Sequence, residues 1–443
     1  MNTPIASFID SYAKKGTLRL HMPGHKGKGP TGTEYADITE IKGADVLSEA
    51  KGIIGESEKN AAEIFMTGAT YYSTEGSSLS IKAMLAAVLN GRNGNRRIVA
   101  ARNVHKSFVF AAALLQFDVE WIYPEGNEHL CSCLVAPERL QTVLSAESEL
   151  PAAVYVTSPD YLGNMQDIKG LAEVCRKFSV PLLVDNAHGA YTAFLESSMH
   201  PIALGASMCC DSAHKTLPVL TGGAYLHVSK DFDVRPEIIR NSLSLFGSTS
   251  PSYLILRSLD LCNEYLADRY RNELAGCVKR VNELRRSLAY AGWKPVGSEP
   301  LKITIDCAAS GISGNSVADM LREQNIEPEF SDGNYVVMMF SPQVPADGYG
   351  KVSAAFGAAP DNAAAELPAD RLSPSERALS IRDAILGRQV TVPVAEAVGC
   401  ICGTPVVSCP PAVPVVISGE IITGKAAEVL RHCGINEISI VKV

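Results

Sequence analysis

Five short apolar runs, separated by stretches with helical spacing, constrain the fold of this chain more than any other feature. Between the runs, residues 104–115 and 168–178 carry apolar side chains at the spacing of one helix face. Strands that alternate with helices pack into mostly parallel sheets that are buried on both faces. The pattern predicts an α/β protein with a large, mostly parallel sheet, whose strands include Arg97–Ala101, Val119–Tyr123, Ala152–Val156, Pro181–Asp185 and Gly223–His227.

The rest of the chain predicts a second, smaller domain and a terminal segment. With 443 residues, 46% of them hydrophobic, the chain has room for two or three domains. A helical pattern over residues 254–288 is a candidate bridge, strand-like runs follow at 301–305 and 335–339, and an Ala- and Pro-rich stretch at 358–374 is typical of a linker. We expect an N-terminal arm (1–34), a large domain (35–271), a small α/β domain (272–370) and a C-terminal segment (371–443).

Charge and cysteine usage narrow the function classes. The formal net charge is -8 and the isoelectric point is about 5.7, so no basic surface for nucleic acid is expected. No run reaches the roughly 18 apolar residues of a membrane helix, and the N-terminus lacks a secretory pattern. None of the twelve cysteines belongs to a CxxC pair. We therefore expect reduced thiols, no metal and a cytoplasmic location.

Lys215 and Asp185 are the residues with the clearest chemical meaning. Lys215 lies between a strand-like run and the Gly222–Gly223 turn, whose glycines permit close approach of the backbone to a bound group. Asp185 ends an apolar run, where a buried carboxylate needs a cationic partner. An amine that traps an aldehyde and a carboxylate that keeps a pyridine nitrogen protonated indicate pyridoxal 5′-phosphate (PLP) as the cofactor. The alternatives are an exposed lysine and a helix-capping aspartate.

Two groups of residues fit the phosphate of this cofactor. Ser77 and Ser78 follow Gly76 at the start of a helical run, and backbone N–H groups at a helix start attract anions. A simple N-cap is the alternative for these serines. Ser212 and His214 offer further donors beside the lysine. Together they predict a phosphate site.

His105 is a candidate for contact with the cofactor ring. It directly follows an apolar strand, at the edge where α/β sheets place residues that contact ligands. Its imidazole is suited to stack on a flat ring. A helix-starting histidine bonded to a neighbouring carbonyl is the alternative.

Taken in order, these motifs resemble those of the Orn/Lys/Arg decarboxylases, PLP enzymes of the aspartate-aminotransferase fold type (fold type I). The resemblance implies a short form, similar to the biosynthetic type, without the N-terminal receiver-like domain of the large inducible enzymes. It also implies that Thr249 and Ser250 reach the cofactor of the partner subunit, and hence a homodimer with shared active sites. The matching segments span nearly the whole chain: 20–27, 76–78, 102–107, 157–163, 184–190, 212–215, 249–253, 409–414 and 419–420.

The resemblance implies a role for each site residue. Lys215 is the Schiff-base lysine, His105 stacks on the cofactor ring, and Asp185 pairs with the pyridine nitrogen. His188 should lie near the ring. The phosphate would be held by Gly76, Ser77, Ser78, Ser212 and His214 in the large domain.

Three positions depart from the family pattern. Glu75 stands where asparagine is usual before the phosphate-binding glycine, Asn186 where glutamate usually follows the aspartate, and Asp160 where threonine usually precedes the tyrosine. A carboxylate close to a phosphate repels it unless the carboxylate points away. Glu75 therefore either contributes only its backbone or marks a different substrate site.

The function implied is decarboxylation of a basic amino acid to its amine and CO2, in polyamine biosynthesis. By resemblance alone arginine is favoured, then lysine or ornithine. Lys215, with its neighbour His214, is expected to return the proton. A basic substrate needs a carboxylate, for which Glu329 and Glu420 are candidates; both could instead be surface or structural acids. An aminotransferase, a carbon–sulfur lyase and a non-catalytic PLP-binding regulator remain alternatives.

Overall fold

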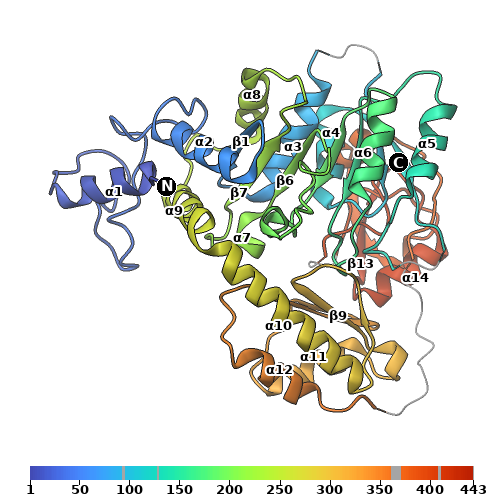
Figure 1. Ribbon diagram of the computed structural model, residues 1–443. Coiled ribbons are helices and arrows are strands. Elements are labelled where there is room, and N and C mark those ends of the chain that lie inside the picture. The colour runs from blue at the N-terminus through green and yellow to red at the C-terminus, as the bar shows by residue number, and fades with distance from the viewer. Residues whose placement is uncertain (92–94, 127–128, 361–370, 408–410, 443) are drawn as a thin grey trace. The chain divides into compact units, whose positions relative to one another are not determined.

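The computed structural model describes residues 1–91, 95–126, 129–360, 371–407 and 411–442, coloured along the chain in Figure 1. These residues form two compact units, each built from two stretches of chain. The first unit comprises residues 1–92 and 168–274, and the second comprises residues 93–167 and 275–443. The four-part division expected from the sequence remains a prediction.

The first unit contains four strands in the order β1-β7-β6-β5. Strands β5 and β6 are parallel, whereas β7 is antiparallel to both β6 and β1. Every residue of β5, β6 and β7 is buried, which explains their nearly continuous apolar sequences. The strand bounds are β1 (Ala69–Ser73), β5 (Leu182–Asp185), β6 (Met208–Asp211) and β7 (Ala224–Val228).

Helices cover this sheet and tie the N-terminal residues to it. Helix α3 packs against β6 and β7 and against α8, while α1 and α2 both pack against α9. The Ser252 hydroxyl accepts a hydrogen bond from the Ile255 N–H and so caps the start of α9. The helices are α1 (Pro4–Lys14), α2 (Ile53–Phe65), α3 (Gly76–Leu89), α6 (Ile168–Lys177), α7 (Ala213–Thr216), α8 (Pro236–Phe246) and α9 (Tyr253–Asp268), with a 3-10 turn η1 (Ala190–Phe194).

The second unit contains three groups of strands. Parallel strands lie in the order β4-β2-β3, an antiparallel sheet has the order β10-β11-β9-β8, and β12 pairs with β13. Their bounds are β2 (Arg97–Ala101), β3 (Asp118–Ile122), β4 (Ala153–Thr157), β8 (Pro295–Val296), β9 (Lys302–Asp306), β10 (Phe330–Ser331), β11 (Tyr335–Met339), β12 (Gln389–Pro393) and β13 (Glu437–Val441).

One apolar core in this unit joins the terminal segment to earlier parts of the chain. Val394, Val415 and Leu430 are buried in the same cluster as Leu162 and Val337. Burial of this apolar surface favours packing of the terminal segment within the unit. The helices of the unit are α4 (Lys106–Leu115), α5 (Pro137–Ala146), α11 (Gly314–Glu323), α12 (Gly348–Phe356), α13 (Ile381–Leu386) and α14 (Gly424–His432), with 3-10 turns η2 (Ala308–Ser310) and η3 (Val394–Glu396).

The predicted α/β class with a mostly parallel sheet is confirmed, and each predicted strand lies within one residue of an observed one. The single helix expected over residues 254–288 is wrong. Instead α9 ends at Asp268 and α10 (Tyr270–Tyr290) begins two residues later. Burial of Leu266, Tyr270 and Leu274 at intervals of four continues across the break. Hydrophobic spacing therefore did not reveal the one residue, Arg269, at which the helix is interrupted.

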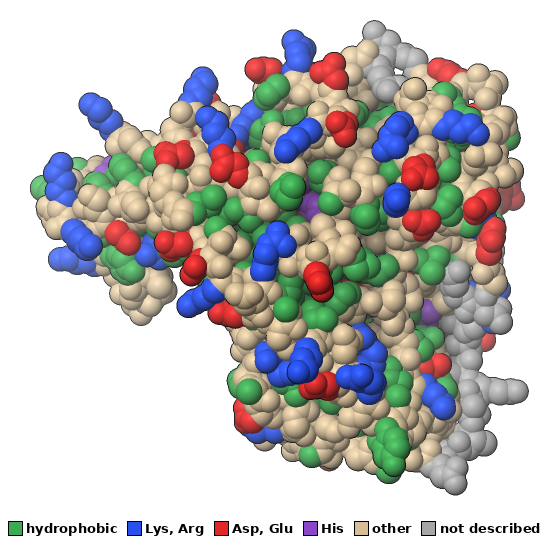
Figure 2. All heavy atoms as spheres, viewed as in Figure 1, with side chains coloured by type: hydrophobic (Ala, Val, Ile, Leu, Met, Phe, Trp, Pro, Cys, Tyr) green, Lys and Arg blue, Asp and Glu red, His purple; other side chains and the backbone are tan. Residues whose placement is uncertain are grey.

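The surface charges, the cysteines and the helix lengths can each be compared with the expectations drawn from the composition. Figure 2 shows basic and acidic side chains interspersed over the visible face. The eleven cysteines that the structure describes are free thiols. No helix among the described residues is both long and apolar enough to cross a membrane. Within the expected linker, residues 361–370 lie outside the described residues, as do Cys409 and Pro410 of the last motif.

Candidate active site

Lys215 lies just beyond the end of β6, in the short helix α7. Its Nζ is 3.1 Å from Nε2 of His188. Its backbone N–H donates to the Ser212 carbonyl at 3.0 Å, which closes the turn that carries the lysine away from the strand. The Lys215 side chain is exposed although the strand before it is fully buried. The fold therefore presents an accessible amine at the edge of a buried sheet, beside an imidazole.

Asp185 is the last residue of β5, the parallel neighbour of β6. It is only 2% exposed, and its Oδ1 accepts a hydrogen bond from the Ala187 N–H at 3.2 Å. Asp185 is in register with Cys210, whose Sγ lies 3.6 Å from the same oxygen. Because β5 and β6 are parallel, Asp185 and Lys215 come from the same edge of the sheet, where α/β proteins bind ligands.

The start of α3 lies close to the turn that follows Lys215. The Gly76 N–H donates to the Gly222 carbonyl at 2.7 Å. Gly222 has a φ of +99°, and a Cβ there would lie 2.8 Å from the Thr74 carbonyl oxygen, so a larger residue would force the turns apart. The Ser212 hydroxyl donates to the Ser77 hydroxyl at 2.8 Å. The two predicted phosphate-binding segments are thus brought together at a helix N-terminus, which attracts anions.

Glu75 is one of the three departures from the family pattern, and its carboxylate bonds to the turn at Ser248. Oε1 of Glu75 accepts a hydrogen bond of 2.6 Å from the Ser248 N–H. Ser248 in turn accepts a hydrogen bond from the Ser250 N–H at 3.1 Å. The carboxylate therefore holds the turn that precedes Thr249 and Ser250. This contact gives the Glu75 carboxylate a specific partner in the fold.

Asn186 also has a specific partner. Its Nδ2 donates to Oδ1 of the fully buried Asp211 at 2.7 Å. A glutamate at this position would place a second carboxylate beside Asp211, which is costly in a buried site. Sequence reasoning missed Asp211, although it ends an apolar strand just as Asp185 does.

His214 is oriented by the backbone. Its Nδ1 lies 3.0 Å from the Gly223 carbonyl oxygen, which can only accept, so Nδ1 carries the hydrogen. Burial lowers the pKa of His214, and the nearby Lys215 charge adds to this effect. In the neutral ring Nε2 is therefore an acceptor. Donation from Nε2 to a phosphate would require a second proton.

His105, in the second unit, is held in one orientation at the N-cap of α4. Its Nδ1 accepts a hydrogen bond from the Ser107 N–H at 3.1 Å and lies 2.9 Å from the Ser107 hydroxyl. The Lys106 N–H donates to the Ala412 carbonyl at 3.0 Å. These contacts fix the plane of the imidazole, as a ring that stacks on a cofactor requires.

Glu329 and Glu420, both in the second unit, have different surroundings. Glu329 is exposed and accepts a 2.5 Å hydrogen bond from the Tyr161 hydroxyl. It lines a cavity of about 400 Å³. Glu420 is only 4% exposed, accepts from the Ile417 N–H at 2.9 Å and lies 3.8 Å from Arg102. Burial raises the pKa of Glu420, and Arg102 acts in the opposite direction.

Asp160, the third departure, is a loop residue with internal partners. Its Oδ1 accepts from the backbone N–H groups of Leu162 and Asn164, each at 2.9 Å. Its Oδ2 accepts from the Asn164 side chain at 2.9 Å. The carboxylate therefore organises the loop after β4.

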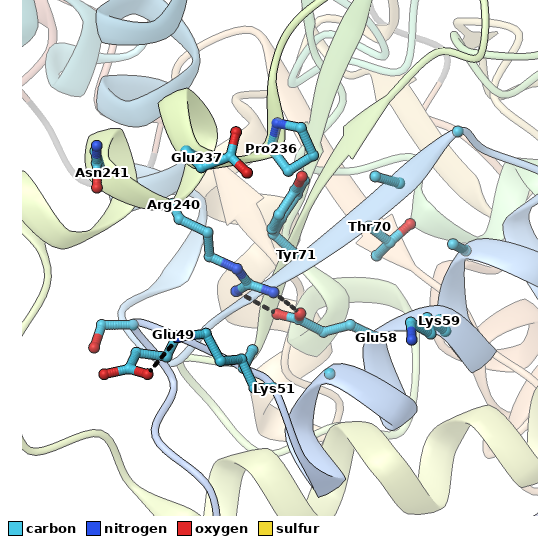
Figure 3. A pocket seen from close by; sticks show the side chains of 16 residues that line it. Glu49, Lys51, Glu58, Lys59, Thr70, Tyr71, Pro236, Glu237, Arg240 and Asn241 are labelled. Atoms are coloured by element: carbon cyan, nitrogen blue, oxygen red, sulfur yellow. Dashed lines mark hydrogen bonds and ion pairs between the residues drawn. The ribbon is translucent and has the colours of Figure 1, made fainter.

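A different cavity in the first unit contains none of the predicted site residues. Its volume is about 520 Å³, and it surrounds the ion pair between Arg240 and Glu58 (Figure 3). Burial raises the pKa of Glu58, and Arg240 partly offsets that rise. The Arg240 guanidinium also lies 4.6 Å from the centre of the Tyr71 ring. Arg240 therefore already contacts two side chains of the protein, Glu58 and Tyr71.

The residues of the first unit fit PLP on their own geometry. An accessible amine and a buried carboxylate come from the same sheet edge, and a pair of serine hydroxyls lies at the start of a helix. The donor set therefore offers an amine for the aldehyde, a carboxylate for the pyridine nitrogen and hydroxyl and N–H groups for the phosphate.

Comparison with known proteins agrees with this geometry. A family model described as "Orn/Lys/Arg decarboxylase, major domain" matches residues 3–295. The arginine decarboxylase of Bacillus subtilis is 31% identical over 95% of this chain and 91% of its own length. That of Halalkalibacterium halodurans is 29% identical over 97% and 93%. The Escherichia coli constitutive lysine decarboxylase shares the fold, with a TM-score of 0.80 and 18% identity over 100% of this chain and 82% of that one.

Proposed function

The chain belongs to the Orn/Lys/Arg decarboxylase family, and from this premise we propose that it decarboxylates arginine with PLP, with lysine and ornithine as weaker substrates. The observation that carries the proposal is the 3.1 Å contact between Lys215 and His188 at the sheet edge that Asp185 also occupies. The products would be agmatine and CO2, which would supply polyamine biosynthesis. PLP, when bound, supplies the electron sink for loss of the carboxylate.

The protein's own residues would bind and orient the cofactor and return a proton after CO2 leaves. Asp185, buried and fixed by the Ala187 N–H, would keep the pyridine nitrogen protonated. His105, with its ring plane fixed by Ser107, would stack on the cofactor ring. Lys215 would return the proton after CO2 leaves, because its Nζ is accessible and His188 is an adjacent proton partner. His214 would then act as a positioning residue for the turn.

Glu329 is our first candidate for binding the basic end of the substrate. It is exposed at a cavity, and the Tyr161 hydroxyl orients its carboxylate. A guanidinium is suited to such a carboxylate because it presents two parallel N–H donors. Glu420 is the second candidate, since its oxygens already contact Ile417 and Arg102. Arginine is also the substrate named for both Bacillales relatives.

We further propose a cytoplasmic homodimer in which Thr249 and Ser250 reach the cofactor of the second subunit. The Glu75–Ser248 hydrogen bond supports this role, because it restrains the turn from which both residues project. Loss of that restraint would weaken cofactor binding in the other subunit.

Product analysis tests the proposal. PLP-loaded protein is incubated separately with arginine, lysine and ornithine, and the products are identified by mass spectrometry. We expect agmatine to form fastest and Lys215→Ala to abolish amine formation. Intact amino acids, or a keto acid in place of an amine, would contradict decarboxylation.

A pair of matched variants tests whether the Glu329 carboxylate binds the basic end of the substrate. Glu329→Gln should raise the KM for arginine about 10- to 100-fold, because a charge-assisted hydrogen bond is worth about 1.5–3 kcal/mol. Glu327→Gln is the control, since Glu327 pairs with Arg322 on the surface. An unchanged KM in Glu329→Gln would exclude Glu329 as the binding carboxylate.

A further inference from the structure

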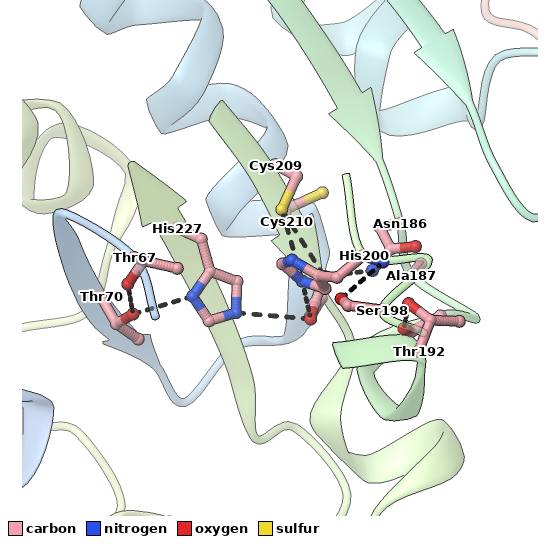
Figure 4. A network of polar contacts seen from close by, with 12 residues as sticks. Thr67, Thr70, Asn186, Ala187, Thr192, Ser198, His200, Cys209, Cys210 and His227 are labelled. Carbon is pink, nitrogen blue, oxygen red and sulfur yellow. Dashed lines mark hydrogen bonds and ion pairs between the residues drawn. The ribbon is translucent and has the colours of Figure 1, made fainter. Parts of the chain in front are cut away.

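Four side chains that could ligate a metal meet in the interior of the first unit. His200 follows η1, Cys209 and Asp211 lie on β6, and His227 lies on the neighbouring β7. Each of them is at most 1% exposed. Figure 4 shows the two imidazoles and the Cys209 thiol directed toward one small region. The active-site chemistry proposed above uses none of these four residues.

The spacing of the potential ligand atoms is regular. Nε2 of His200 and Nε2 of His227 lie 3.1 Å and 3.3 Å from the same oxygen, Oδ2 of Asp211. Sγ of Cys209 is 3.8 Å from Nε2 of His200 and 3.9 Å from Oδ1 of Asp211. Tetrahedral zinc with ordinary bond lengths separates its nitrogen, oxygen and sulfur ligands by about 3.3 to 3.6 Å. The potential ligand atoms of His200, Cys209 and Asp211 all lie within 4.8 Å of one another, and Nε2 of His227 adjoins this group through its 3.3 Å contact with Asp211.

A chain of hydroxyl groups leads to Nδ1 of His227. Thr67 donates to the Ala62 carbonyl at 3.5 Å and lies 2.8 Å from the Thr70 hydroxyl. When Thr67 donates to Ala62 in this way, Thr70 donates to Thr67 and accepts from Nδ1 of His227, at 2.8 Å. In the neutral ring this leaves the lone pair of Nε2 facing Oδ2 of Asp211. A metal-bound histidine characteristically donates its other N–H in this way.

Two acceptors that face each other at 3.3 Å repel unless a cation lies between them. Nε2 of His227 does not make a hydrogen bond of acceptable geometry to any of the described residues. The other carboxylate oxygen, Oδ1, is already occupied by the Asn186 amide. The space between Oδ2 of Asp211 and the two imidazoles is therefore suited to a cation that both imidazoles would contact.

We propose that His200, Cys209, Asp211 and His227 bind a divalent metal ion of the zinc class as a closed, four-ligand structural site. Two imidazoles, a thiolate and a carboxylate are ligand types that zinc accepts. The negative charges of the thiolate and the carboxylate would neutralise the ion inside the protein, which removes the cost of an unpaired buried charge.

The ion would cross-link the ends of β6 and β7. Asp211 directly precedes Ser212, and it accepts a hydrogen bond from Asn186, the residue that follows Asp185. The metal would therefore hold rigid the two strand ends from which the candidate active site projects. Its function would be structural, so the inference does not depend on the proposed decarboxylation.

Metal content of the holoenzyme tests this inference. Protein from zinc-supplemented medium, purified without chelators, should carry about one zinc ion per chain, and Cys209→Ala and His200→Gln should each retain less than about a tenth of it. Cys175→Ala is the matched control, because Cys175 is a buried cysteine on α6 away from the cluster, and it should retain the full metal content. Metal-free wild-type protein would overturn the proposal.

A second measurement covers the case in which the variants fail to fold. Wild-type protein grown with cobalt in place of zinc should show the thiolate-to-cobalt charge-transfer absorption of a cysteine-ligated tetrahedral site. Absence of that absorption would contradict ligation by Cys209. Nitrogen NMR of the protein as isolated offers the opposing outcome: a His227 ring that carries a hydrogen on Nε2 would show that this hydrogen, and not a metal ion, faces Asp211, and the proposal would fail.

Discussion

Asp211 and Asp260 are both buried carboxylates of the first unit, yet their pKa values shift in opposite directions. Burial raises the pKa of Asp260 to about 6, because the Ser57 hydroxyl at 2.6 Å and neighbouring backbone N–H groups, including that of Ala6 at 2.9 Å, do not outweigh the loss of water. Burial also disfavours the charge of Asp211, but the His200 and His227 imidazoles outweigh it and lower its pKa. Between these two carboxylates, the neutral donors around Asp260 do not compensate for burial of the charge, whereas the two imidazoles around Asp211 do.

This difference indicates different roles for the two carboxylates. Asp260 joins α1 and α2 to α9 through hydrogen bonds that a neutral carboxyl could also make in part. Asp211, on β6, contacts Asn186 just after β5 and the imidazoles of His200 and of His227 on β7, and its negative charge favours the two imidazole contacts. The first is a packing contact at the N-terminal helices, and the second stabilises the sheet edge of the candidate active site.

The largest expected effect is the loss of the Asp211 charge. Asp211→Asn should lower the free energy of unfolding by about 3–5 kcal/mol, because it breaks a buried charge pairing. Asp260→Asn should cost only about 1 kcal/mol, since it loses one hydrogen bond but also removes an unfavourable buried charge. Urea denaturation at neutral pH measures both. Equal losses in the two variants would contradict the comparison.

The pH dependence of stability separates the two carboxylates further. The folded-state pKa of Asp260 is raised from 3.8 to about 6, so the folded protein keeps a proton that the unfolded chain has already released. Its contribution to stability should therefore fall as pH rises from about 4 to 6, by about 3 kcal/mol in total. The measurement is the difference between wild type and Asp260→Asn in denaturation across this range. A difference independent of pH would exclude the raised pKa.

The smallest expected effect concerns the hydrogen bonds of Asp260. Ser57→Ala should lower the free energy of unfolding by about 1 kcal/mol at neutral pH, because the carboxylate loses its closest donor. Ser80→Ala is the matched control: this buried α3 hydroxyl makes no hydrogen bond to the described residues. That variant should be neutral or slightly more stable. Equal destabilisation by both variants would show that loss of side-chain volume, not the hydrogen bond, is responsible.

Much of the fold was predictable because its signals are local. Short apolar runs identified most strands of the parallel part of the sheet, since burial on both faces of a parallel sheet selects such runs. Lys215 and Asp185 were recognisable because Asp185 ends such a run and Lys215 lies a few residues after one. The break between α9 and α10 was missed, because the same buried face continues on both sides of Arg269.

Other features could not be predicted because they depend on residues far apart in the chain. Glu75 was expected to be a difficulty beside a phosphate, yet its partner is Ser248, 173 positions away. Glu420 and Glu329 were equivalent as sequence candidates, and only their partners, Arg102 and Tyr161, distinguish a buried acid from an exposed one. No local pattern reports such pairings.

The sequence by itself determined the α/β class, the positions of several strands along the chain and the placement of an amine and a carboxylate near the ends of two apolar runs. The tertiary structure alone decided the environment of each carboxylate, and with it the direction of each pKa shift. The reason is physical: strand formation follows from burial patterns within a few residues, whereas the charge state of Asp211 depends on His227, which reaches it only when β6 and β7 pair.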